Sequence, residues 1–150
     1  MSSETQNILS LLTATFEKNA WHGPSVKEVL YEITAEHVSK KLGDTHSIIE
    51  LVAHMTAWRK FVIRRLEGDE LYTIEEHMNF PAVTDWSKTL QDLYESQAKL
   101  VELLKTFPTT RLSEVVPHGA YRYTYYTLLH GIIHHDVYHI GQISLIKKTF

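Results

Sequence analysis

The chain has 150 residues, a net charge of −3 and no cysteine, and 43% of its residues are hydrophobic. This length allows one domain with a sizeable core, and the lack of cysteine excludes disulfides, thiolate metal sites and cysteine nucleophiles. No apolar run approaches the roughly 20 residues of a membrane span, no basic block indicates a nucleic-acid surface, and Met1–Gln6 lacks signal-peptide features. We therefore expect a single cytoplasmic domain over residues 1–150 that contacts neither nucleic acid nor membrane.

A first helix is predicted from Ser3 to about Asn19. Ser3 is a favourable N-cap, and Gln6 stands three residues later as its capping-box partner. An apolar stripe with helical spacing follows, made of Ile8, Leu11, Leu12 and Phe16.

A turn and a shorter helical piece come next. The Gly-Pro pair within residues 21–25 indicates the turn. Ser25 and Glu28 have capping-box spacing, which predicts a helix start at that point. Residues 34–42 either continue this piece or restart after a kink, and the sequence leaves both alternatives open.

Three long amphipathic helices make up the rest of the chain. The first begins at Thr45 or Ser47 and reaches about Leu66, the second covers residues 86–107, and the third covers residues 124–148. The connections over 68–85 and 111–123 have no clear period. The predicted fold is all-α, a four-helix bundle with a short extra helical segment between the first and second long helices.

Residues 130–143 of the last helix contain four of the ten histidines. His135 and His139 are four residues apart, so a helix places both on one face, roughly 6 Å apart at Cβ and within reach of one metal ion. His130 and His134 have the same spacing. A helical wheel surrounds the first pair with Leu128, Ile132, Gln142 and Ile146, and the second with Gly141, Leu145 and Lys148. The first face is more typical of a bundle interior, which favours His135 and His139.

His54 lies within the apolar stripe of the long helix expected to end at about Leu66. A lone histidine in such a position is most often a core residue with one hydrogen bond. Facing helices of a bundle, however, direct their inward side chains into a shared space. His54, His135 and His139 together would supply three imidazole ligands and leave coordination positions open, which is the pattern of a catalytic metal site.

Two segments also resemble a known family. Residues 48–58, with His54 at their centre, and the His-x-x-x-His-x-Gly-Gln-Ile pattern that begins at His135 look like the DinB/YfiT-like superfamily. Residues 21–25 and the His46-Ser47 pair resemble a recurrent subgroup of it. The resemblance implies an up-down-down-up bundle, often a homodimer, with a divalent metal on His54, His135 and His139. Zinc or nickel is the metal we expect.

Other candidates have a structural alternative beside the functional one. Glu50, one turn from His54, is a candidate general base or a solvated glutamate. Gln142 is a candidate for a hydrogen bond to metal-bound water or for a helix–helix contact. Asp136 is a candidate to orient a ligand imidazole, but its place beside a ligand on the helix favours another direction. Trp21, His22, His46 and Trp58 are candidate substrate-binding residues, or loop anchors and core aromatics.

Two functions follow as hypotheses. Characterised relatives implied by the resemblance include transferases that use low-molecular-weight thiols, so the first is a metal-dependent thiol-S-transferase or hydrolase acting on a small molecule. The second is a non-catalytic bundle that binds metal or a small molecule in a stress response, or that mediates dimerisation. No convincing acid–base pair in the sequence decides between them.

Overall fold

The computed structural model describes residues 3–119 and 121–150. Residues 1, 2 and 120, which belong to the expected N-terminal segment and the second irregular connection, lie outside this part. The described residues form helices and no named strand, apart from one isolated bridge between Val115 and Thr124. The elements are α1 (Glu4–Phe16), α2 (Val26–Leu30), α3 (Ile48–Leu66), α4 (Glu76–Asn79), α5 (Trp86–Thr106), the 3-10 helix η1 (Thr109–Ser113) and α6 (Tyr125–Lys147). The predicted all-α fold is confirmed.

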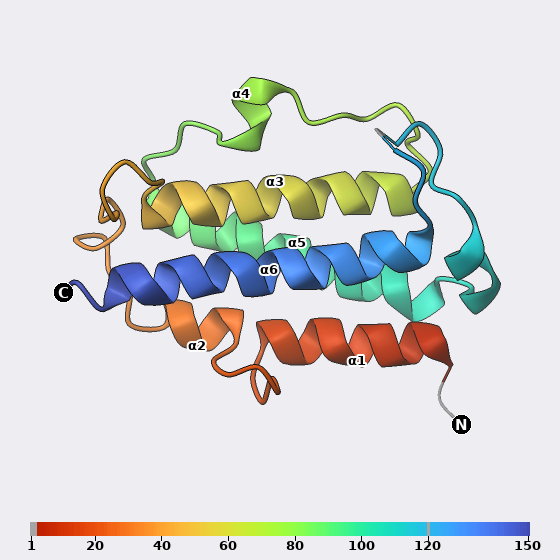
Figure 1. The fold of residues 1–150 in the computed structure, drawn as a ribbon, viewed down its shortest axis with the longest axis horizontal. Helices are drawn as coiled ribbons and strands as arrows, with labels where there is room; N and C mark the ends of the chain where they lie inside the picture. The colour runs from red at the N-terminus through yellow and green to blue at the C-terminus, as the bar shows by residue number, and fades with distance from the viewer. Residues whose placement is uncertain (1–2, 120) are drawn as a thin grey trace.

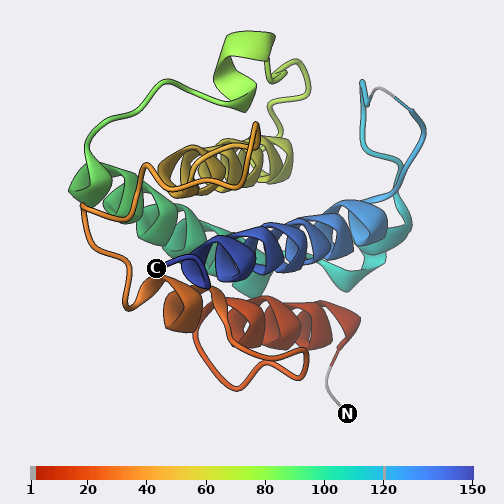
Figure 2. The same cartoon turned by 60° about the vertical axis from the view of Figure 1, so that its left-hand side comes forward.

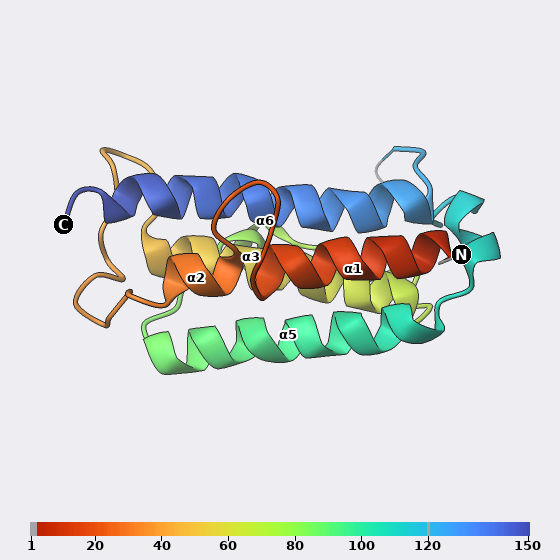
Figure 3. The ribbon, with the colours of Figure 1, turned by 90° about the horizontal axis from the view of Figure 1, so that it is seen from below.

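Four long helices lie side by side in the bundle (Figures 1 and 3). α3 packs against α5 and α6, and α1 packs against the same two helices. The short α2 follows α1 in nearly the same line, so the two together cover one side of the bundle (Figure 3). α1 and α6 run in one direction along the bundle while α3 and α5 run in the other (Figure 1).

The helix starts follow the capping signals. Ser3 and Ser25 are N-caps with complete capping boxes, and Ser47, rather than the alternative Thr45, caps α3. Thr124 caps α6 by accepting a hydrogen bond from the backbone N–H of residue 127. The hydroxyls of Ser3, Ser25 and Thr124 accept hydrogen bonds from backbone N–H groups that have no partner inside the helix.

The first helix ends earlier than expected. α1 stops at Phe16, and Asn19 has a left-handed φ of 63° that no helix interior contains. The carbonyl of Glu17 accepts a hydrogen bond from the hydroxyl of Ser25, which brings the start of α2 back against the end of α1. Residues 34–42 form turns and neither continue α2 nor start another helix.

The connection between α3 and α5, residues 67–85, crosses the outer face of α3 (Figure 2). It contains α4, which the sequence did not predict because this one-turn helix has no buried residue and therefore no apolar period. α4 nevertheless packs against α3. The connection thus covers the helix that carries His54.

The core is divided into two apolar clusters along the bundle axis. On α6, one cluster reaches Ile133 and the other begins at Ile140, while on α3 the same two clusters are separated between Met55 and Phe61. Buried polar residues fill the level between them. They are His54, Arg59, Gln97, Asp136 and His139. No helix within the described ranges is long and apolar enough to cross a membrane.

Candidate metal centre

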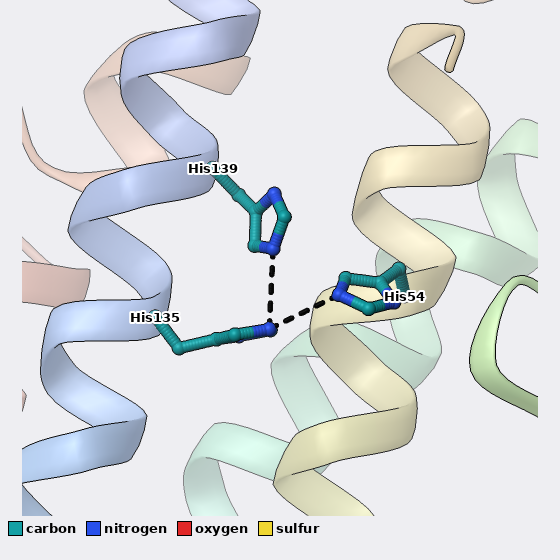
Figure 4. Close-up of side chains that lie close together, drawn as sticks. All are labelled: His54, His135 and His139. Atoms are coloured by element: carbon teal, nitrogen blue, oxygen red, sulfur yellow. Dashed lines mark hydrogen bonds between the residues drawn. The ribbon is translucent and has the colours of Figure 1, made fainter. Parts of the chain in front are cut away.

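Three imidazole rings converge in the polar level between α3 and α6 (Figure 4). The Nε2 atom of His135 lies 3.1 Å from Nε2 of His54 and 3.1 Å from Nε2 of His139. One ligand atom from each ring lies within 4.8 Å of the others. His54 and His139 are buried and His135 is half-buried. The three residues predicted as metal ligands therefore lie together. Two of them, His54 and His135, are 81 positions apart in the sequence and are brought together by the packing of α3 against α6.

The second histidine pair of α6 faces elsewhere. His134 is exposed, and Nδ1 of the half-buried His130 lies 3.0 Å from the backbone carbonyl oxygen of Tyr126 on the preceding turn. Neither residue belongs to the ligand group. The helical wheel therefore identified the inward pair from the apolar character of its neighbours.

The two Nε2 separations that involve His135 suit a divalent ion. A metal bound to imidazole nitrogen at about 2.0–2.1 Å holds its ligand atoms about 2.9 Å apart at octahedral angles and about 3.4 Å apart at tetrahedral angles. The observed 3.1 Å separations lie between these limits. Three protein ligands would leave at least one coordination position for water or substrate.

Hydrogen bonds at Nδ1, the ring nitrogen that faces away from the centre, orient the rings of His54 and His139 for metal binding. Nδ1 of His54 lies 2.6 Å from the backbone carbonyl oxygen of Asn79, and Nδ1 of His139 lies 2.6 Å from Oε1 of Gln142. Both acceptors require an N–H on Nδ1, which leaves the Nε2 lone pair free to point inward. Nδ1 of His135 is buried and has no hydrogen-bond partner among the described residues. The three histidines therefore fit a metal ion, although the orientation of the His135 ring is not fixed by a hydrogen bond at Nδ1.

The electrostatic environment keeps the three rings neutral. Burial lowers the pKa of His54 and of His139. Burial, together with the neighbouring His139 and His54, lowers the pKa of His135 to about 3. Neutral imidazole is the form that binds a metal, so all three residues are ready to coordinate at neutral pH.

Aromatic rings cover the His54 side of the centre. The Phe80 ring stacks on the His54 ring with centroids 4.1 Å apart. The His46 ring also stacks on Phe80, with centroids 3.5 Å apart. The ring centroids of Trp58 and His135 are 6.0 Å apart, and the indole N–H of Trp58 donates to the side-chain oxygen of Asn79. His46 and Trp58, two of the predicted substrate-binding residues, therefore lie in the surroundings of the histidines. The Phe80 ring stacks on both His46 and His54.

The remaining residues that the sequence suggested for catalysis or substrate binding lie apart from the three histidines. The Glu50 carboxylate accepts hydrogen bonds from the backbone and hydroxyl of Ser47, which lower its pKa. It thus stabilises the start of α3. Trp21 and His22 are exposed in the turn between α1 and α2, and no described contact joins either to the histidines. Their role in substrate binding stays a prediction.

A buried ion pair beside the centre was not identified as part of the site. The guanidinium of Arg59 on α3 donates to the carboxylate of Asp136 on α6 and to the amide oxygen of Gln97 on α5. The Asp136 carboxylate therefore faces Arg59 and not the imidazoles. The sequence analysis favoured this orientation because Asp136 is next to His135 on the helix. Asp136 is the only acidic residue of α6, and this isolated charge in an apolar helix is the sequence signal that could have indicated a buried partner. Asn79 and Phe80 had no such signal, because their connection lacks a period.

Comparison with known proteins gives one family. The model of the DinB superfamily matches residues 6–143, which include all three histidines. No curated protein and no solved structure gives a significant match. The matched segment extends over nearly all of the bundle, from the first helix to the end of the histidine pattern, and the chain therefore belongs to the DinB superfamily.

Proposed function

We propose that this protein binds a divalent metal ion through Nε2 of His54, His135 and His139 and uses it to activate a small molecule. The observation that carries this proposal is the meeting of three neutral imidazole nitrogens, 3.1 Å apart in two pairs, in a buried polar level. Zinc or nickel suits such a ligand set, since both accept imidazole readily. The up-down-down-up bundle and the homodimer that the resemblance implies, and the cytoplasmic location expected from the sequence, are part of the same proposal.

The chemistry follows from what the residues can hold. A metal at this position would supply a nucleophile at neutral pH by lowering the pKa of a bound thiol or water. Asn79 and Gln142 hold the His54 and His139 rings through their Nδ1–H groups. Phe80 and Trp58 exclude water from the His54 side. The reaction we propose is transfer of a low-molecular-weight thiol to an electrophile, or hydrolysis of a small substrate.

A second candidate function is metal binding without catalysis. It is favoured by one observation: within the described chain, the two carboxylates nearest the histidines in sequence are already engaged. Glu50 is bound by Ser47 and Asp136 by Arg59, so neither is free to move protons for a reaction. A bundle that only stores or senses metal would need no such group.

Cobalt(II) substitution tests both candidates. Cobalt(II) bound to three imidazoles gives a visible absorption spectrum that depends on its remaining ligands. Addition of 2-mercaptoethanol is expected to produce a sulfur-to-cobalt charge-transfer band if thiols reach the metal, and this band should be lost in His54→Ala. A cobalt spectrum that no thiol or anion changes would favour the non-catalytic candidate, and failure to bind cobalt at all would refute both.

A further inference from the structure

A cavity lies beside α3, apart from the three histidines. It has a volume of about 290 Å³, close to the lower limit of ordinary small-molecule sites. α3, α5 and the connection between them form its walls, and none of the three metal-binding candidates lines it. The lining residues are Ala53, Thr56, Ala57, Lys60, Tyr72, Ile74, His77, Met78, Pro81, Val83, Thr89 and Asp92.

Most of the polar side chains that line this cavity are already paired with other protein groups. The hydroxyls of Thr56 and Thr89 donate to carbonyl groups of their own helices. Asp92 forms an ion pair with Lys88, and the His77 ring lies near Glu75. In the part of the chain that the structure describes, Lys60 has no carboxylate within ion-pair distance. The walls are otherwise mainly apolar, so the cavity combines an apolar interior with one free positive charge.

The connection between α3 and α5 lines the cavity and also contacts His54. Met78 and Pro81 line the cavity, while the two residues between them face the other way. The backbone carbonyl of Asn79 accepts from Nδ1 of His54, and Phe80 stacks on the His54 ring. A molecule that presses against Met78 and Pro81 therefore acts on the segment that orients His54.

We infer that this cavity binds a small organic carboxylate with an apolar body, and that residues 78–81 transmit its binding to the His54 ring. The apolar body would fill the space between α3 and the connection, and the carboxylate would pair with Lys60. This inference goes beyond the proposed metal chemistry and does not depend on it, since every contact that carries it is made by the protein alone.

Titration of the metal-free protein with benzoate, and with uncharged benzamide, tests the binding. Benzoate is expected to bind saturably, with a Kd on the order of 1 mM, and to shift amide signals of residues 53–60 and 74–83 in nitrogen-15 NMR spectra. Because an exposed ion pair contributes little to binding, benzamide should bind only about threefold more weakly. Absence of saturable binding, or shifts confined to another surface, would overturn the inference.

Three variants make the test specific. Lys60→Gln should remove the preference for benzoate over benzamide, while Lys105→Gln, an exposed lysine near the end of α5, should keep it. Ala57→Phe should fill the cavity and abolish binding of both probes; its circular dichroism and melting temperature establish whether it is folded. If that variant fails to fold, the Lys60→Gln comparison still decides, and a benzoate preference that survives there contradicts the inference.

The imidazole signals of His54 test the transmission. Long-range nitrogen-15 spectra of the metal-free protein should show the His54 ring signals moving as benzoate saturates the cavity, with the same Kd as the amide shifts. The signals of His134, an exposed residue of α6 that does not line the cavity, should not move. Saturable benzoate binding that leaves the His54 ring unchanged would refute the transmission to His54.

Discussion

Arg59 on α3 and Asp136 on α6 form an ion pair whose two side chains are both fully enclosed. Nε of Arg59 lies 3.3 Å from Oδ1 of Asp136, and a second nitrogen of the guanidinium donates to the other carboxylate oxygen. Gln97 accepts a further hydrogen bond from the same guanidinium at 2.7 Å. This pair joins the two helices that carry the histidines, at the same level of the bundle.

Removing one charge of this pair should destabilise the fold strongly. Asp136→Asn leaves the Arg59 guanidinium buried without a counter-charge, and such a change typically costs about 3–5 kcal/mol. Glu114→Gln is the matched control, since it removes the exposed partner of Arg111, where we expect less than about 1 kcal/mol. Urea denaturation of the three proteins measures the effect. Equal stability of Asp136→Asn and wild type would show that the pair does not hold α3 and α6 together.

The hydrogen bond between Gln142 and His139 should contribute to metal affinity. Gln142→Leu removes the acceptor of the Nδ1–H group, which frees the ring to rotate or change tautomer, and loss of such a contact typically lowers metal affinity about 10–100-fold. Gln142→Glu restores an acceptor and should recover most of the affinity. Competition with a zinc-binding dye measures both.

Gln91→Leu provides the control for that substitution. Gln91 is exposed on α5 and bonds only to Glu95 among the described residues. Zinc affinity should be unchanged in this variant. If Gln142→Leu also binds zinc as tightly as wild type, the orientation of His139 does not depend on Gln142.

The metal-free protein should lose stability as the pH falls from 7 to 5. Histidines of the unfolded chain take up protons near pH 6.5, whereas burial lowers the folded-state pKa of His54 and His139 and lowers that of His135 to about 3. The unfolded state therefore binds more protons in this range, and the free energy of unfolding decreases. For His135 alone we expect a loss of about 1–2 kcal/mol. Urea denaturation at pH 7, 6 and 5 measures it.

Single-histidine variants assign this pH dependence. His135→Ala should show a shallower decrease than wild type, since its largest contributor is absent. His134→Ala, which removes an exposed neighbour, should keep the wild-type slope. The same slope in all three proteins would mean that the buried imidazoles do not resist protonation in the folded state.

Much of the bundle could be predicted because its signals are local. Capping residues such as Ser25 and Ser47 and the 3.6-residue apolar period act within a few turns, so the helix starts and the long helices agree with the structure. The end of α1 differs because a hydroxyl from the next helix, that of Ser25, fixes it. α4 has no buried side chain and hence no pattern to detect.

The three histidines were predictable, and the groups that surround them were not: helical spacing gave one pair, and the bundle argument with the family resemblance added His54. The pairing of His135 and His139 follows from their i,i+4 positions, and the apolar surroundings of the pair gave its direction. The approach of His54 and the Arg59–Asp136 pair depend on how α3 packs against α6, which no local pattern encodes. Asn79 and Phe80 reach His54 from an irregular connection. The enclosing parts of the site therefore became visible only in three dimensions.

The metal content of wild-type protein beside His54→Ala and His134→Ala, all purified without a histidine tag, tests the central claim most directly. Elemental analysis after incubation with zinc and removal of excess ion should give about one zinc per chain in wild type and in His134→Ala, and much less in folded His54→Ala. Equal zinc in all three proteins, or none in wild type, would contradict a metal centre formed by His54, His135 and His139.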